Sequence, residues 1–364
     1  AWRRARVARC SPAGRRSVRR MPIGPLAARL PKIHLHCHLE GCLRAATFVE
    51  LAERNGVALR YKSDDAGIDR DDPYGFTTFG EFLYIFAAVS RSLKHPEDYA
   101  RLAREFVEDA LAQGVIYGEL FVSPPVWTFF NPQLDVRTTM EALVGELRAA
   151  RPQATFKLLP DLTRNFGPER AMTTARAMAA LTDLDVVGLS LGGDEMRYPA
   201  KPFADVFAFA RAQGLHCVAH AGEAAGGESV RDAIEVLGAE RIGHGIRALE
   251  DAHAVKLLAS RGLPLEICPT SNRLTGTELA AHPHPYLDFD RLGCVVTIDC
   301  DDPALFRTSI EQEYALVEAV AGSNALERYV RNAIASSFAG QELKQTMEAR
   351  VDAAVAELPA AAGS

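Results

Sequence analysis

The sequence predicts an α/β protein, a (β/α)8 barrel with an extra helical insertion after strand 1. Eight short runs of β-branched and apolar residues recur along the 364-residue chain, and amphipathic helical patterns separate them. Polar residues gather where these runs end, which is the side of a barrel that carries function. A doubly wound sheet is the structural alternative, but it usually has fewer strands and a glycine fingerprint after the first one. The "GGDE" at 192–195 does not fit that fingerprint.

The expected strands follow one another at intervals that leave room for a helix between each pair. In chain order they are 32–41, 115–124, 154–163, 185–195, 215–223, 241–245, 264–272 and 294–303.

Two of the intervening helices are marked by their ends. In 96–114, Pro96 suits a first helical turn and Gly114 ends the apolar stripe. In 228–238, Ser229 is a candidate cap and Gly238 a terminator. The segment 42–95 is the insertion. We expect most aromatic rings of its stretch "FTTFGEFLYIF" to be core, with one or two at the roof of a pocket.

Charge divides the chain into an N-terminal extension, residues 1–20, and a single barrel domain, residues 21–364. Residues 1–20 hold eight arginines and no acid, so the remainder carries −6 − 8 = −14. We expect the extension to be disordered or not native; a transit peptide is the alternative, but an apolar face is missing. The acidic domain predicts no nucleic-acid partner and no membrane association, and no apolar run reaches the roughly 18 residues of a membrane span.

The cysteines predict a reduced compartment. There are seven, an odd number, without a C-x-x-C pair. That usage fits a cytoplasmic protein better than a disulfide framework or a thiolate zinc site.

The stretch "KIHLHCHLEG" places His34, His36 and His38 on alternate positions, so a regular strand would point all three the same way. At about 3.3 Å per residue, His34 would lie roughly 13 Å below His38. We therefore expect His36 and His38 to be metal ligands near the barrel mouth. His34 is expected to be a buried, hydrogen-bonded residue of the lower layers.

Two further metal ligands are expected from other strand ends, His220 and Asp301. Three imidazoles and a carboxylate, without a thiolate, suit one Zn²⁺ per chain, with Fe²⁺ or Mn²⁺ as alternatives. A position left for water makes such a site catalytic, because the metal lowers the pKa of that water to about 7.

The motifs "PKIHLHCHLEG", "GGDE", "HAGE", "RIGHG", "CPTSN" and "DDP", in this order, resemble the adenosine deaminase family of metal-dependent (β/α)8 hydrolases. The resemblance runs from about Leu30 to the helices after Pro303. It implies a purine substrate, adenosine, that is hydrolysed to inosine and ammonia, with the four metal ligands named above.

The resemblance also implies the roles of the remaining polar residues. Glu223 would protonate N1 as hydroxide attacks C6, and His244 would orient the water and assist its deprotonation. Substrate contacts would fall to His38, Glu40, Gly193 and Asp302, with Asp302 at N7 and the Gly193 N–H at N3.

Four positions depart from the pattern of adenosine-specific family members. None of them is an expected metal ligand or the expected acid. Glu40 stands where an aspartate usually meets the ribose 5′-hydroxyl, and Phe121 replaces an arginine. Ser190 replaces an aspartate, and Asp299 an asparagine. Adenine and aminodeoxyfutalosine are therefore the alternative substrates. Another mononuclear amidohydrolase and a non-catalytic binding protein are more distant alternatives. The sequence leaves the oligomeric state open.

Overall fold

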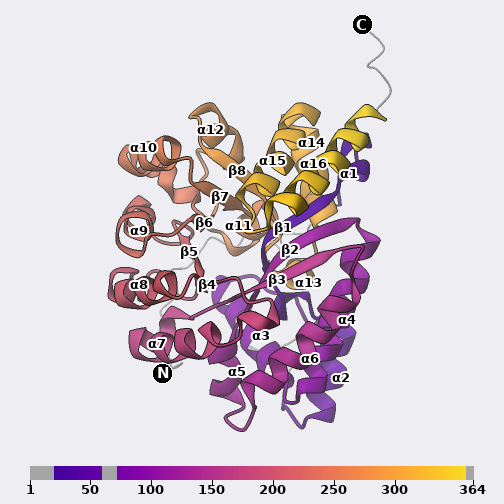
Figure 1. Cartoon of the computed structure of the whole chain (residues 1–364), viewed down its shortest axis with the longest axis vertical. Helices are drawn as coiled ribbons and strands as arrows, with labels where there is room; N and C mark the ends of the chain where they lie inside the picture. The colour runs from indigo at the N-terminus through magenta and orange to yellow at the C-terminus, as the bar shows by residue number, and fades with distance from the viewer. Residues whose placement is uncertain (1–19, 60–71, 358–364) are drawn as a thin grey trace, which may run out of the picture.

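The structure, a computed structural model, describes residues 20–59 and 72–357, and its centre is a ring of parallel strands surrounded by helices (Figure 1). Apart from Arg20, the N-terminal extension lies outside the described residues. The strands are β1 Lys32–His38, β2 Val115–Val122, β3 Thr155–Pro160, β4 Gly188–Leu191, β5 His216–Ala221, β6 Arg241–His244, β7 Pro264–Ile267 and β8 Val295–Ile298. Each lies within one of the expected runs, in the expected order.

The strands close into a barrel in two groups. Strands β1 to β3 pair in one group and β4 to β8 in the other. The parallel bridges Cys37–Asp301 and Asp161–Ser190 join the groups at the two seams. The predicted (β/α)8 barrel is confirmed.

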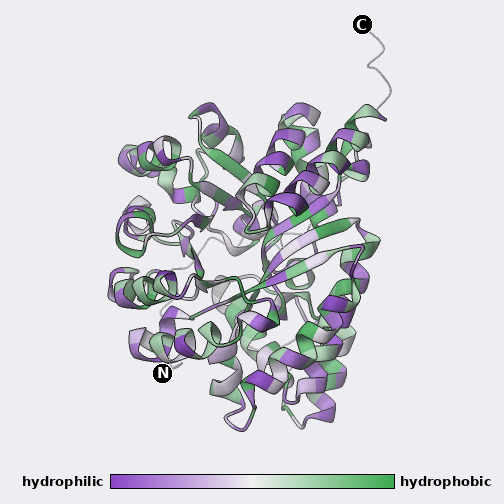
Figure 2. Cartoon of the chain, viewed as in Figure 1, coloured by the Kyte–Doolittle hydropathy of each residue, from purple (hydrophilic) through white to green (hydrophobic). Residues whose placement is uncertain are grey.

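The helices pack around the barrel. They are α1 Pro25–Arg29, α2 Ala45–Arg54, α3 Phe79–Ser92, α4 Pro96–Ala112, α5 Pro124–Phe130, α6 Val136–Ala149, α7 Gly167–Ala179, α8 Ala204–Ala212, α9 Gly227–Asp232, α10 Ala252–Arg261, α11 Pro269–Thr275, α12 Pro285–Arg291, α13 Pro303–Phe306, α14 Ile310–Ala321, α15 Ser323–Ser336 and α16 Gln341–Ala356. Helices α2 and α3 form the expected insertion after β1. Figure 2 shows apolar and polar colours alternating along most helices, as amphipathic packing requires. None of the described helices is long and apolar enough to cross a bilayer.

Two details of the predicted elements were wrong. The residues "PTSN" after β7 are not strand but open α11, with Pro269 in its first turn. Ser229 does not cap a helix, because α9 already begins at Gly227. Gly238 does end this segment, in the left-handed conformation at φ 65°.

Strand β1 carries a bulge that changes which way His34 points. His34 pairs with Gly118 and Cys37 with Leu120, so three steps on β1 span two on β2. His34 therefore leaves the side of His36 and packs against Phe106 of α4, with ring centroids 6.2 Å apart. The expectation of a position in the lower barrel layers was wrong, although His34 is buried.

The barrel interior holds a charged layer beneath the mouth. Arg241 of β6 bridges two carboxylates, with Nε 2.6 Å from Glu266 and Nη2 2.7 Å from Glu119. Its Nη1 donates to the carbonyl of Ser336, and the ring of Phe338 covers the guanidinium at 4.0 Å. All three charged side chains are buried. Because the charges are paired with one another, removing one of them would leave a buried charge without its partner.

We expect Arg241→Met to lower the free energy of unfolding by about 3–5 kcal/mol, because it leaves buried Glu119 without a counter-charge and removes one of the two partners of Glu266. Denaturant unfolding of the purified protein measures this loss. The control is Arg104→Met, whose side chain is 55% exposed beside Glu146 and should cost at most about 1 kcal/mol. Equal losses for the two variants would contradict the structural role of Arg241.

Candidate active site

A cavity of about 130 Å³ opens at the carboxyl ends of the strands. Its floor is polar and comes from strand ends: His38, Asp161, Thr163, Gly192, Gly193, Asp194, His220, Glu223, His244, Asp301 and Asp302. Its apolar walls come mainly from α3 and α5: Phe82, Leu83, Phe86, Ala87, Val126, Phe129, Phe130 and Phe166. Two rings of the predicted aromatic segment, Phe82 and Phe86, thus line the cavity, as expected.

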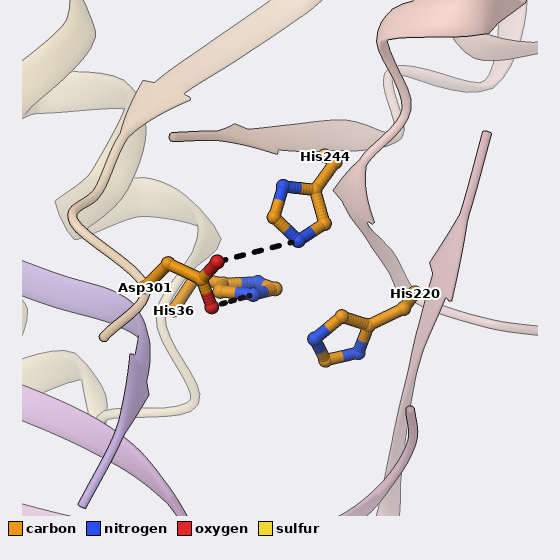
Figure 3. A group of neighbouring side chains, drawn as sticks. All are labelled: His36, His220, His244 and Asp301. Atoms are coloured by element: carbon orange, nitrogen blue, oxygen red, sulfur yellow. Dashed lines mark ion pairs between the residues drawn. The ribbon is translucent and has the colours of Figure 1, made fainter. Parts of the chain in front are cut away.

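Four histidines and Asp301 converge at the cavity floor. One carboxylate oxygen of Asp301 lies 3.5 Å from Nε2 of His36 and 3.4 Å from Nε2 of His38, and the other lies 4.0 Å from Nε2 of His244. The Nε2 atoms of His38 and His220 are 3.1 Å apart. Figure 3 shows the carboxylate of Asp301 facing His36 and His244, with His220 of β5 on the other side of the group. Ligand atoms of His36, His220, His244 and Asp301 all lie within 4.8 Å of one another, a spacing that can hold a metal ion.

The donor atoms fit a divalent cation. Nε2 of His36 and Nδ1 of His220 are buried without a hydrogen-bond partner. Burial opposes a charge on His36, but the neighbouring carboxylates of Asp301 and Glu266 outweigh it and raise its pKa to about 10. Burial lowers the pKa of His38, and that of His220 further. The carboxylates of Asp301 and Glu266 therefore favour a positive charge at the position of His36. The imidazoles of His38 and His220 beside it are neutral.

Neighbouring side chains fix the orientation of these groups. Nδ1 of His36 lies 2.8 Å from Glu266, which Arg241 holds from the other side. Ser271 donates to Asp301 at 2.6 Å. The side-chain amide nitrogen of Asn272 is 3.2 Å from Nδ1 of His244. Such outer contacts set the ring and carboxylate directions in metal sites.

Two of the converging residues have a strained backbone. His244 has φ 58° and Asp301 has φ 62°, in the left-handed region that non-glycine residues rarely adopt. Strain of this kind concentrates at functional sites, where the surrounding fold must hold it. In "RIGHG", Gly243 is also required, since a Cβ there would lie 2.7 Å from Cε1 of His36.

Glu223 follows β5 and faces His244, with Oε2 3.8 Å from Nε2 of that ring. Its side chain is 15% exposed, and burial, with Asp301 and Glu195 nearby, raises its pKa to about 8. Burial also holds the pKa of Asp302 well above its ordinary range, whereas the surrounding histidines overcome burial and hold that of Asp301 well below. Burial lowers the pKa of His244 to about 3, so that ring is neutral.

The sequence argument assigned no role to the residues that hold the "HAGE" turn. Glu195, in "GGDE", accepts hydrogen bonds from the backbone N–H groups of residues 222–225 at 2.6 to 3.2 Å. Buried Arg164 donates to the carbonyl of His220 at 2.6 Å. Asp161 lines the cavity and accepts from the N–H of Gly192. The polar ends of the third and fourth expected strands were the available signal.

Glu40 lies away from the cavity. Its Oε1 accepts hydrogen bonds from the N–H of Ser123 at 2.8 Å and from Nε1 of Trp127 at 2.6 Å. The residue is fully buried and does not line the cavity wall. Burial raises its pKa to about 7. The structure therefore places the expected contact to a ribose hydroxyl outside the cavity, where Glu40 instead anchors the start of α5.

The remaining expected site residues come together. His38, His220, Asp301, Glu223, His244, Gly193 and Asp302 line one cavity, and His36 lies directly beneath it. Gly193 has φ 102°, and a Cβ there would lie 2.3 Å from Oδ1 of Asn165, so only glycine fits without displacement.

Comparison with known proteins gives one family. The model of the family described as adenosine deaminase matches residues 31–354. An adenine deaminase of Rhizobium rhizogenes is 35% identical over 90% of this chain and 100% of its own length. An adenosine deaminase of Pectobacterium atrosepticum is 35% identical over 89% of this chain and 97% of its own.

Two solved structures resemble this chain along most of its length. An adenine deaminase from Arthrobacter aurescens matches with a TM-score of 0.82 and 28% identity over 90% of this chain and 99% of its own. A zinc-bound amidohydrolase from Burkholderia ambifaria matches with a TM-score of 0.80 and 25% identity over 91% and 94%. The chain belongs to the adenosine deaminase family and is a hydrolase that acts on a C–N bond of a purine ring.

Proposed function

We propose that this chain is a zinc-dependent adenine deaminase, which converts adenine and water to hypoxanthine and ammonia. The observation that carries the choice of substrate is the position of Glu40, which is bound to Ser123 and Trp127 and not to the cavity. A free base needs no partner for a ribose hydroxyl. The Rhizobium relative, named adenine deaminase, supports the same choice.

His36, His38, His220 and Asp301 are the proposed metal ligands. His38 is preferred to His244 because its Nε2 is nearer to Asp301, at 3.4 Å against 4.0 Å, and contacts His220. When bound, Zn²⁺ would lower the pKa of a coordinated water and supply a nucleophile at neutral pH. Three imidazoles and a carboxylate also accept Fe²⁺ or Mn²⁺.

The direction of each pKa shift gives the protonation state of the cavity residues, and their proposed roles follow from it. Glu223 keeps its proton at neutral pH and is placed to give it to N1 of the ring, which makes C6 more electrophilic. Neutral His244 faces both Glu223 and Asp301 and is placed to orient the attacking water by a hydrogen bond. Protonated Asp302 can donate to N7, and the Gly193 N–H is the proposed partner of N3.

The cavity lining disfavours a nucleotide. Among its described residues there is no lysine or arginine that could bind a phosphate. The walls are aromatic and aliphatic, which suits the face of a purine base. Adenosine is the second candidate, because the Pectobacterium relative of equal identity is named adenosine deaminase.

Substrate preference is tested by ammonia release from adenine, adenosine, 2′-deoxyadenosine, AMP and aminodeoxyfutalosine with zinc-loaded protein. We expect kcat/KM for adenine to exceed the others by about tenfold or more, equivalent to about 1.4 kcal/mol in transition-state binding. A preference for adenosine would overturn the choice of adenine and keep the deaminase chemistry. No turnover of any purine, with metal bound, would overturn the deaminase proposal.

Glu223→Gln should lower kcat by about 10² to 10⁴, because the amide keeps the shape of the side chain but cannot supply the proton. Metal content should stay unchanged. The matched control is Glu228→Gln, whose side chain on α9 is 72% exposed and should leave kcat near the wild-type value. Full activity in Glu223→Gln would assign the acid to another residue.

The pH profile of kcat/KM should fall on the alkaline side. Glu223 acts in its protonated form and its pKa is raised to about 8, so activity is full below this pH and declines about tenfold per unit above it. A bound cation would stabilise the carboxylate and draw the decline toward lower pH. Steady-state rates across the pH range measure it, and the residual activity of Glu223→Gln should lack this decline.

A further inference from the structure

A second group of metal-binding side chains lies on the opposite side of β1 from the active site. It consists of His34 and Cys37 of β1, Cys42 in the 3₁₀ turn η1 Glu40–Cys42, and Cys300 in the loop after β8. We call these four residues the thiol cluster. All four are buried, with exposed fractions of 3%, 0%, 6% and 1% in that order.

The β-bulge creates this cluster. Without it, alternation along β1 would put His34 on the face of His36 and opposite to Cys37. The register shift between His34 and Cys37 brings both to the same side, toward Cys300. The strand thus presents imidazoles to the active site on one side and an imidazole with a thiol on the other.

Two separations within the cluster are close to the edges of a tetrahedral zinc site. Zinc bonds of about 2.3 Å to sulfur and 2.0–2.1 Å to nitrogen give edges of roughly 3.8 Å between two sulfurs and 3.5 Å between sulfur and nitrogen. Sγ of Cys300 is 3.7 Å from Nδ1 of His34, and Sγ of Cys37 is 3.5 Å from Sγ of Cys42. The donor atoms of His34, Cys37 and Cys300 all lie within 4.8 Å of one another.

A separate cavity gives the cluster access. It has a volume of about 290 Å³ and is bordered by His34, Cys42 and Cys300, together with Arg44 and Asp109. Among the residues that the structure describes, none borders both this cavity and the active-site cavity. An ion can therefore reach the thiol cluster without passing the purine site.

We propose that the thiol cluster is a second metal site, distinct from the active site, that binds Zn²⁺ through three thiolates and one imidazole. Binding releases three thiol protons to solvent and leaves a four-coordinate complex without a site for water, which is typical of structural zinc. Cys42 completes the set by turning its sulfur from the carbonyl of His38, which it now contacts at 3.3 Å.

A metal there would tie together three segments, two of which carry active-site residues. Cys37 stands between His36 and His38, Cys42 ends the turn that holds Glu40, and Cys300 precedes Asp301. The proposal does not depend on the identity of the substrate, and its test requires no activity.

The test uses the full chain produced in cobalt-supplemented medium, so that Co²⁺ is present as the protein folds. Thiolate ligands give Co²⁺ an intense charge-transfer band in the near ultraviolet, whereas the active-site ligands include no thiolate. We expect this band in the wild type, with about two cobalt ions per chain. Cys37→Ser and Cys300→Ser should each lose the band and retain about one ion. The matched control Cys294→Ser, a buried cysteine outside the cluster, should keep both.

The wild type alone can overturn the proposal, so it does not rest on a variant that fails to fold. About one cobalt ion per chain with no thiolate band would do so. A band that survives in Cys300→Ser would place the thiolates elsewhere in the chain. Loss of two titratable thiols from the denatured, unreduced wild type would also overturn it, because Cys37 and Cys42 would then form a disulfide instead.

Discussion

The contact between His36 and Glu266 is the constraint on which the site depends. Glu266 accepts from Nδ1 of His36 at 2.8 Å and from Arg241 at 2.6 Å, so one buried carboxylate joins the barrel interior to the cavity floor. Burial disfavours ionisation of Glu266, but the charge of Arg241 and the bond to His36 outweigh it and lower its pKa. The ionised carboxylate fixes the ring so that Nε2 faces Asp301. Glu119 balances the remaining charge of Arg241. The ligand direction on β1 is therefore set by residues on β2, β6 and β7.

Above this layer, carboxyl groups in one small cavity differ in protonation because their neighbours differ. Asp301 is surrounded by imidazoles and stays ionised, while Glu223 and Asp302 lie near its negative charge in a poorly solvated place and retain protons. A cation site and a proton donor can then coexist at neutral pH. Glu195 keeps the donor in place through four backbone N–H groups, and this explains why "GGDE" and "HAGE" occur together in one chain.

The bulge in β1 gives one strand two chemical faces. His36 and His38 point toward the cavity, whereas His34 and Cys37 point toward Cys300 and the helix layer. One extra residue in the ladder is sufficient, because strand side chains alternate with a period of two. The proposed zinc at the thiol cluster would stabilise the same segment that positions the active-site ligands.

The sequence by itself determined the barrel, since eight alternating strand and helix patterns leave few other packings. It also determined which polar residues meet at the mouth, because the carboxyl ends of parallel strands share one rim. Other features were decided only by the tertiary structure, because the sequence pattern does not specify them. A single register shift reversed the direction of His34, and a distant indole and backbone N–H occupied the carboxylate of Glu40. The left-handed backbones of His244 and Asp301 and the grouping of three thiols arise in the same way. Each depends on contacts between residues far apart in the chain, which local periodicity does not report.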